Sequence, residues 1–210
     1  MHRNDTVVYD RTHIKAIALD MIAAAFETSA TVIVWALSEL LRNPRVMKAL
    51  KHELRRHAAE TFRLHPAGSL LPREAIEDAR VGEWWIEKGT RVIVNVWAMG
   101  RDRSVWSENA EEFWPERFEE REVDFRGRES LMFVPFGSGR RGCPGIHLGL
   151  STVKLVVAQM VHCFEWELPG GMGPEELDMG EKFGLSMPKA EHLLAVPSMS
   201  KWVDLAHQGL

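Results

Sequence analysis

A cysteine in a glycine-rich loop is the part of this 210-residue chain best suited to chemistry. The loop spans residues 136–145, contains four glycines and carries Cys143 near its end. Glycine lets a backbone approach a ligand closely, and Pro144 suits the first position of a following helix. A thiol at a helix N-terminus, with Arg140 and Arg141 close by, is stabilised as the thiolate. The pattern therefore indicates a sulfur anion held as a strong electron-donating ligand for a metal.

An acid and an alcohol stand together in the first long apolar stretch, within residues 24–29, Ala-Ala-Phe-Glu-Thr-Ser. A carboxylate in an apolar helix is costly without a partner, so Glu27 needs water, a partner or a function. The hydroxyl of Thr28 can bond to the preceding turn and open the helix locally. Together the two side chains can pass protons. The alternative is an ordinary buried helix with one satisfied glutamate.

Helices must position most of these groups. Apolar residues that recur every three and four positions predict a helix of about thirty residues, from near residue 10 to Asn43, which is long enough to cross a domain. A second helical pattern follows Pro44 and continues with little interruption to Pro66. A third pattern, apolar on more than one side, runs from Cys143 to Phe164.

β-structure is predicted in two places. Residues 82–99 are typical of two strands joined by a turn at Lys88 and Gly89, and residues 183–196 of a minor strand pair around Pro188. The long segment 100–142 is irregular, and such a loop is usually functional or supports a functional site. The predicted fold class is therefore mainly α with a small β region.

Composition excludes several classes of function. Hydrophobic residues make up 45% and charged residues 27%, the balance of a globular protein. A net charge of −4 leaves no bulk positive field, so no nucleic-acid partner is expected. Two cysteines are too few for a disulfide scaffold. Because charged residues interrupt the apolar stretch 14–41 and the first residues lack a signal-peptide core, no membrane anchor is predicted in this chain.

These motifs resemble those of plant microsomal cytochrome P450 enzymes across residues 9–196. The cysteine loop matches the haem-binding signature F-x-x-G-x-R-x-C-x-G at all five fixed positions, Phe136, Gly139, Arg141, Cys143 and Gly145. Residues 24–29 resemble the oxygen-activation motif A-G-x-D/E-T-T/S, with Ala25 where the family usually has glycine. Residues 60–66 and 115–118 resemble the family's E-x-x-R and P-x-R-F elements.

The resemblance implies a role for each residue of the cysteine loop. Cys143 would be the axial ligand of haem iron, and Phe136 would pack beside its sulfur. Gly145 would let the following helix approach the ring. Arg141 would pair with one haem propionate, and Arg73 would reach the second.

The other motifs also take implied roles. Thr28 would hydrogen-bond bound dioxygen while Glu27 relays protons from solvent. Glu60, Arg63 and Arg117 would form a buried structural triad that holds segment 100–142 behind the cysteine loop, although an isolated E-x-x-R is usually a solvated surface pair. Four residues match segments that line the substrate pocket in relatives: Ala25, Ala67, Leu70 and Leu185.

The implied protein is a truncated cytochrome P450 fold, with residues 1–210 forming its C-terminal haem-binding part. The implied reaction is monooxygenation of a small lipophilic substrate with O₂. Electrons would come from NADPH through a reductase that docks where Arg140 and Lys154 offer positive charge. The implied location is the cytosolic face of the endoplasmic reticulum membrane.

Two rival interpretations stay open. Only the second half of the family's length is represented, and residues 56–59 form the whole connection between two helices that relatives separate by a longer segment, so these helices either fuse or break there. The chain would then be an inactive truncated product without haem, or a non-catalytic interaction partner. A zinc site of His147, His162 and Cys163 is disfavoured because neighbouring residues 162 and 163 point in different directions on a helix, where Cys163 is expected to be a core residue.

Overall fold

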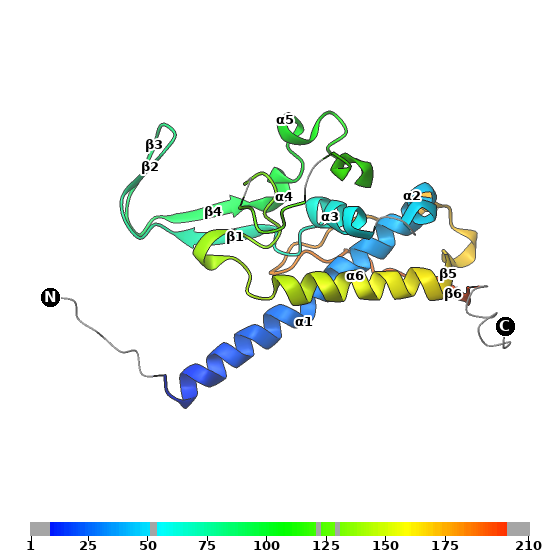
Figure 1. Ribbon diagram of the computed structural model, residues 1–210, viewed down its shortest axis with the longest axis horizontal. Coiled ribbons are helices and arrows are strands. Elements are labelled where there is room, and N and C mark those ends of the chain that lie inside the picture. The colour runs from blue at the N-terminus through cyan, green and yellow to red at the C-terminus, as the bar shows by residue number, and fades with distance from the viewer. Residues whose placement is uncertain (1–8, 51–53, 121–122, 129–130, 201–210) are drawn as a thin grey trace.

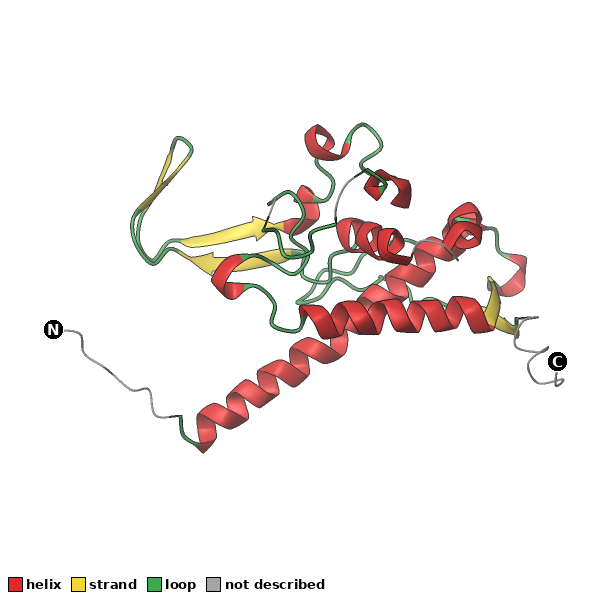
Figure 2. Cartoon of the chain, viewed as in Figure 1, coloured by secondary structure: helices red, strands yellow, loops and turns green. Residues whose placement is uncertain are grey.

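The computed structural model describes residues 9–50, 54–120, 123–128 and 131–200, and it is mainly helical with small β-sheets, as predicted (Figures 1 and 2). The longest helix, α1 (Arg11–Arg42), begins at Asp10, whose carboxylate accepts hydrogen bonds from the backbone N–H groups of Thr12 and His13. Such a cap satisfies N–H groups that have no partner inside the helix. The long helix expected from the apolar period is therefore confirmed.

The core lies where three helices meet. The second half of α1 packs against α6 (Ile146–Cys163) and α3 (Leu54–Leu64), whereas the first half projects from the body (Figure 1). Buried residues of this core include Val32, Leu40, Phe62, Val153 and Val157. The projecting half of α1 instead carries exposed apolar side chains: Ile14, Ile17, Leu19, Met21, Ile22 and Phe26.

Two helices replace the predicted run from Pro44 to Pro66. Helix α2 (Pro44–Ala49) has proline at its first position, and α3 begins at Leu54. The predicted fusion or break between them falls on residues 51–53, which lie outside the described residues. Helix α3 ends at Leu64, just before the expected stop at Pro66.

The predicted hairpin around Lys88 and Gly89 is wrong in its pairing. Strand β3 (Trp84–Ile86) pairs back with β2 (Ala79–Val81), and β4 (Arg91–Asn95) pairs with β1 (Leu70–Glu74). Because Val81 faces Trp84 in the ladder, the hairpin turn has two residues, and Gly82 supplies the positive φ of +60° that such turns need. The β2–β3 hairpin extends away from the body (Figure 2). Strands β3 and β4 do form within the predicted range, but each pairs with a strand earlier in the chain.

The predicted strand pair at 183–196 is also corrected. Only one isolated antiparallel bridge, Glu181 to Lys189, lies near Pro188. The regular strand there is β6 (Val196–Met199), which pairs with β5 (Phe164–Glu167) directly after α6. Pro188 cannot donate a ladder hydrogen bond, so the segment before it stays irregular.

The irregular segment 100–142 surrounds a second, aromatic cluster. It contains short helical turns, α5 (Arg103–Trp106), η2 (Pro115–Phe118) and η3 (Gly139–Arg141), and follows α4 (Val96–Met99). Trp106 and Phe118 pack with Phe133 and against Ala59 of α3. A Cβ at Gly100 would lie 2.1 Å from the carbonyl oxygen of Arg63, so only glycine fits at this close approach.

Candidate functional site

The cysteine loop joins the aromatic core to the start of α6. Gly137 and Gly139 have φ of +68° and +69°, which side chains rarely tolerate. The backbone N–H of Cys143 donates to the carbonyl oxygen of Phe136 at 2.8 Å and closes the loop. Helix α6 begins at Ile146 rather than at Pro144, so Pro144 precedes the helix and the expectation that it occupies the first helical position is wrong.

The loop is anchored from inside and leaves its cysteine at the surface. The Phe136 ring lies 4.9 Å from that of Phe62 and 6.3 Å from that of Phe125, and it contacts the α6 backbone near Gly149. Cys143 is exposed and free. A Cβ at Gly145 would lie 3.8 Å from the Cys143 sulfur, which allows ordinary contact only. The sulfur therefore belongs to an accessible residue and not to a packed interior.

A basic hollow adjoins this loop. Arg73 of β1 and Arg141 of η3 both line it, together with Arg91 and Arg140, and its volume is about 1100 Å³. The Arg73 guanidinium lies 3.5 Å from the position that a Cβ of Gly137 would take, which places β1 against the cysteine loop. Guanidinium groups bind carboxylates in bidentate fashion. The hollow thus suits a ligand with carboxylate groups, beside an exposed thiol.

Glu27 and Thr28 of α1 form hydrogen bonds with different parts of the chain. The Thr28 hydroxyl donates to the Ala24 carbonyl at 2.7 Å, as the sequence suggests, but α1 continues without a break. Glu27 accepts a hydrogen bond at 2.5 Å from the hydroxyl of Ser186, a residue that sequence reasoning missed. Because 159 positions separate the two residues, no local signal could have revealed this contact.

The structure brings Glu60, Arg63 and Arg117 together as a buried cluster. Glu60 accepts from Arg63 through both carboxylate oxygens, each at 2.7 Å, and from Arg117 at 2.9 Å. The other N–H groups of Arg63 donate to the carbonyls of residues 100, 110 and 112. Arg117 binds carbonyls of residues 106 and 109. The cluster therefore fastens α3 to the irregular segment that leads to the cysteine loop.

The structure places the four predicted pocket residues in different surroundings. Ala67 is buried and its carbonyl accepts from the Met187 N–H at 3.1 Å, which brings this turn beside the segment that holds Leu185. Leu185 itself is 97% exposed, Leu70 begins β1, and Ala25 is exposed on α1. Neither of the two hollows described in this subsection is lined by these four residues.

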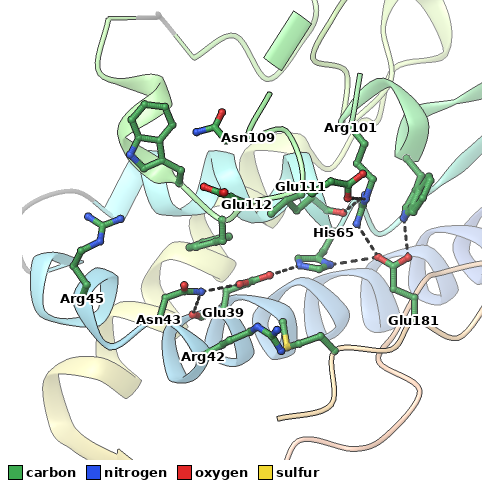
Figure 3. A pocket seen from close by; sticks show the side chains of 15 residues that line it. Glu39, Arg42, Asn43, Arg45, His65, Arg101, Asn109, Glu111, Glu112 and Glu181 are labelled. Atoms are coloured by element: carbon green, nitrogen blue, oxygen red, sulfur yellow. Dashed lines mark hydrogen bonds and ion pairs between the residues drawn. The ribbon is translucent and has the colours of Figure 1, made fainter. Parts of the chain in front are cut away.

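A second, polar hollow of about 850 Å³ lies away from the cysteine loop (Figure 3). His65 sits between two carboxylates there, with Nε2 2.6 Å from Glu39 and Nδ1 3.4 Å from Glu181. Burial opposes ionisation of Glu181, but the His65 ring, the Arg101 guanidinium and the Trp97 indole outweigh it and lower the pKa of this carboxyl. None of the predicted catalytic or cofactor-binding residues lines this hollow, so we read it as a structural ion network.

The zinc alternative finds no support in the described part of the chain. No three His, Cys, Asp or Glu side chains there are placed to hold a metal ion. His147 instead contacts the Arg126 guanidinium, and Cys163 is half-buried at the end of α6. Cys143, with Arg140 and Arg141 close in sequence, remains the candidate metal ligand. A single cysteine thiolate is one of the ligands that proteins supply to haem iron.

Comparison with known proteins decides the family. The family model described as Cytochrome P450 matches residues 1–59 and 58–196. The chain is 52% identical to Cytochrome P450 CYP736A12 of Panax ginseng, with 93% of this chain and 43% of that protein covered. It is 42% identical to geraniol 8-hydroxylase of Catharanthus roseus and 41% identical to salviol synthase of Salvia pomifera, with 90% of this chain and 42% of each relative covered.

The chain belongs to the cytochrome P450 family. It spans less than half the length of these relatives, so its fold is a partial cytochrome P450 fold. The match to the family model comes in two pieces that meet at residues 58–59, inside the short connection noted in the sequence. Membership in the P450 family implies haem, and the residues that would meet such a group are the exposed Cys143 and the arginines of the hollow, two of which, Arg140 and Arg141, precede Cys143 in the same loop.

Two helices in the described part of this P450 are long and apolar enough to cross a membrane, by length and composition alone: α1 and α6. The sequence predicts no such segment because charged residues interrupt residues 14–41, but these charges leave α1 apolar enough to pass this test. Core helices pass the same test, so this finding assigns neither helix to a membrane.

Proposed function

We propose that this chain is the haem-binding part of a P450 monooxygenase that hydroxylates small lipophilic substrates with O₂. The observation that carries the proposal is the exposed Cys143 before α6, in a loop whose Arg141 lines a hollow together with Arg73 of β1. Cys143 would be the axial ligand, and the two arginines would bind the propionates. When bound, haem supplies the activation of dioxygen, which electron donation from a cysteine thiolate favours. Phe136 and Gly145 shape the loop around the sulfur.

Thr28 and Glu27 handle protons in this proposal. Glu27 lies on an exposed part of α1, where its carboxylate can exchange protons with water. Thr28 follows it directly, and its hydroxyl both donates and accepts hydrogen bonds. The bond from this hydroxyl to the Ala24 carbonyl fixes where the hydroxyl lies. Glu27 would take up protons from water in this proposal, and Thr28 would present its hydroxyl as a hydrogen-bond partner one residue further along α1.

The substrate and the partners in this proposal are inferred from the exposed side chains of the chain and from the names of its relatives. Apolar side chains such as Phe26 are exposed beside Glu27, and they suit a lipophilic substrate. One relative is named geraniol 8-hydroxylase, which supports a hydroxylation reaction. Electrons would come from NADPH through a reductase docking near Arg140 and Lys154. We place the protein at the cytosolic face of the endoplasmic reticulum membrane on family grounds.

A second candidate is a haem-free product that acts as an interaction partner or has no activity. The uncovered apolar half of α1 favours it, because exposed apolar surface of this kind marks a protein contact.

The carbon monoxide spectrum of the reduced chain tests the proposal. The chain expressed with a haem precursor should show the red-shifted Soret band of a thiolate-ligated haem. Cys143→Ser should lose this band completely, because the serine hydroxyl is not an anionic sulfur donor. Cys163→Ser, the matched control at the other cysteine, should retain it. A band that persists in Cys143→Ser would refute the ligand assignment, and no haem band in the unaltered chain would favour the second candidate.

Loss of either arginine should weaken haem binding. Arg73→Gln and Arg141→Gln each remove one charge-assisted hydrogen-bond partner of a propionate, so we expect about a tenfold higher Kd for haem in each. Haem titration followed by absorbance measures this change. Arg80→Gln, on the projecting β2 strand, serves as the control and should leave the Kd unchanged. Equal affinities in all three variants would contradict the propionate assignment.

A further inference from the structure

The segment of residues 184–187 is fastened to two other parts of the chain. The Ser186 hydroxyl donates to Oε1 of Glu27 at 2.5 Å, and the Trp35 indole N–H donates to the Met187 carbonyl at 2.8 Å, so two bonds come from α1. The Met187 N–H donates to the Ala67 carbonyl at 3.1 Å. Three hydrogen bonds within two residues hold this segment in one position.

Exposure changes sharply along the same segment. Ser186 is 3% exposed, whereas its neighbour Leu185 is 97% exposed. A buried hydroxyl needs a hydrogen-bond partner, and among the described residues the Ser186 hydroxyl donates to the carboxylate of Glu27. The segment therefore places one polar group against the acid and one apolar group at the surface.

We infer that Ser186 is the positioning residue of Glu27. Its hydroxyl donates to Oε1, which fixes the rotamer of the Glu27 carboxylate. The second oxygen, Oε2, accepts no hydrogen bond from the described residues and stays available for proton exchange. This inference rests on the proposed function for the relay role of Glu27.

Infrared spectroscopy and hydrogen exchange test the inference on the full 210-residue chain without haem. The antisymmetric carboxylate stretch of Glu27 is assigned as the band lost in Glu27→Gln. Ser186→Ala should shift this band and should speed exchange of the Met187 amide and Trp35 indole hydrogens about tenfold, because a charge-assisted bond is lost. Ser186→Thr keeps a hydroxyl and should restore both readouts.

Two controls make the outcome specific. Ser198→Ala removes an exposed hydroxyl that donates to Glu165 at 3.4 Å, and it should change neither readout. In the double variant with Glu27→Ala, Ser186→Ala should add no further exchange, because the two groups act through each other. An unshifted Glu27 band in Ser186→Ala, or additive effects on exchange, would overturn the inference. Because the carbon monoxide spectrum reports Cys143 alone, failure of the proposed function is distinguishable from failure here.

Discussion

Arg63→Met should lower the free energy of unfolding by about 3–5 kcal/mol, the usual cost of breaking a buried ion pair. Arg63 and Glu60 are fully buried, and all five N–H groups of Arg63 donate, two to Glu60 and three to backbone carbonyls. Methionine keeps the length of the side chain but satisfies none of these acceptors. Urea unfolding followed by tryptophan fluorescence measures the change.

Arg45→Met is the matched control for that prediction. Its guanidinium also binds a glutamate, Glu116, but its side chain is 65% exposed. Exposed pairs contribute about 0–1 kcal/mol, so this variant should unfold close to the unaltered chain. Equal losses in the two variants would show that the burial of the Glu60 cluster does not determine its contribution. We also expect Arg63→Met to reduce the amount of haem that the chain incorporates. This effect should be seen before any effect on the reaction, because the cluster is structural.

His57 should make the chain less stable as the pH falls below 6.5. Burial alone lowers the pKa of His57 from 6.5 to about 3. Between these values the unfolded chain binds a proton that the folded chain does not, so stability decreases toward acid pH. A one-proton difference costs about 1.4 kcal/mol per pH unit, or on the order of 3 kcal/mol between pH 6.5 and pH 4.5. Urea unfolding at a series of pH values measures this slope.

His57→Leu should remove most of that pH dependence. Leucine also avoids burying Nε2, which has no hydrogen-bond partner among the described residues. The His57 ring packs edge-on against the Phe113 ring, with the ring centroids 5.2 Å apart. His192→Gln, at an exposed histidine, should keep the slope of the unaltered chain. The difference between His57→Leu and the unaltered chain cancels the contributions of groups common to both. A slope that is the same in His57→Leu and the unaltered chain would show that another group causes the acid sensitivity.

Local features of the fold could be predicted from the sequence. Helices α1 and α6 follow from apolar residues at helical spacing, and a capping aspartate or proline marks helix starts, because these signals act within one or two turns. The strand character of residues 84–95 was equally visible. Its partner was not, since Trp84 pairs with Val81 and Val92 with Arg73, and pairing depends on segments outside the strand.

In the candidate site, too, local features could be predicted from the sequence and long-range contacts could not. Glycines and charges around Cys143 mark the loop in sequence, and the spacing of Glu60 and Arg63 places them on one helix face. The Ser186 hydroxyl at Glu27 could not be predicted, because that contact depends on how residues 184–187 cross α1. The exposure of Leu185 was also unforeseen, since a leucine in a pocket motif is expected to be covered.

The buried cluster of Glu60, Arg63 and Arg117 leaves no space for a side chain at Gly100. The Gly100 carbonyl accepts a short bond from the Arg63 guanidinium, while the Gly100 α-carbon sits against the carbonyl of the same arginine. Helix and loop are thus in backbone-to-backbone contact at the residue whose side chain bridges them. One added methyl would push the acceptor away from its donor, so the lack of a side chain at Gly100 sets the spacing on which this hydrogen bond of Arg63 depends.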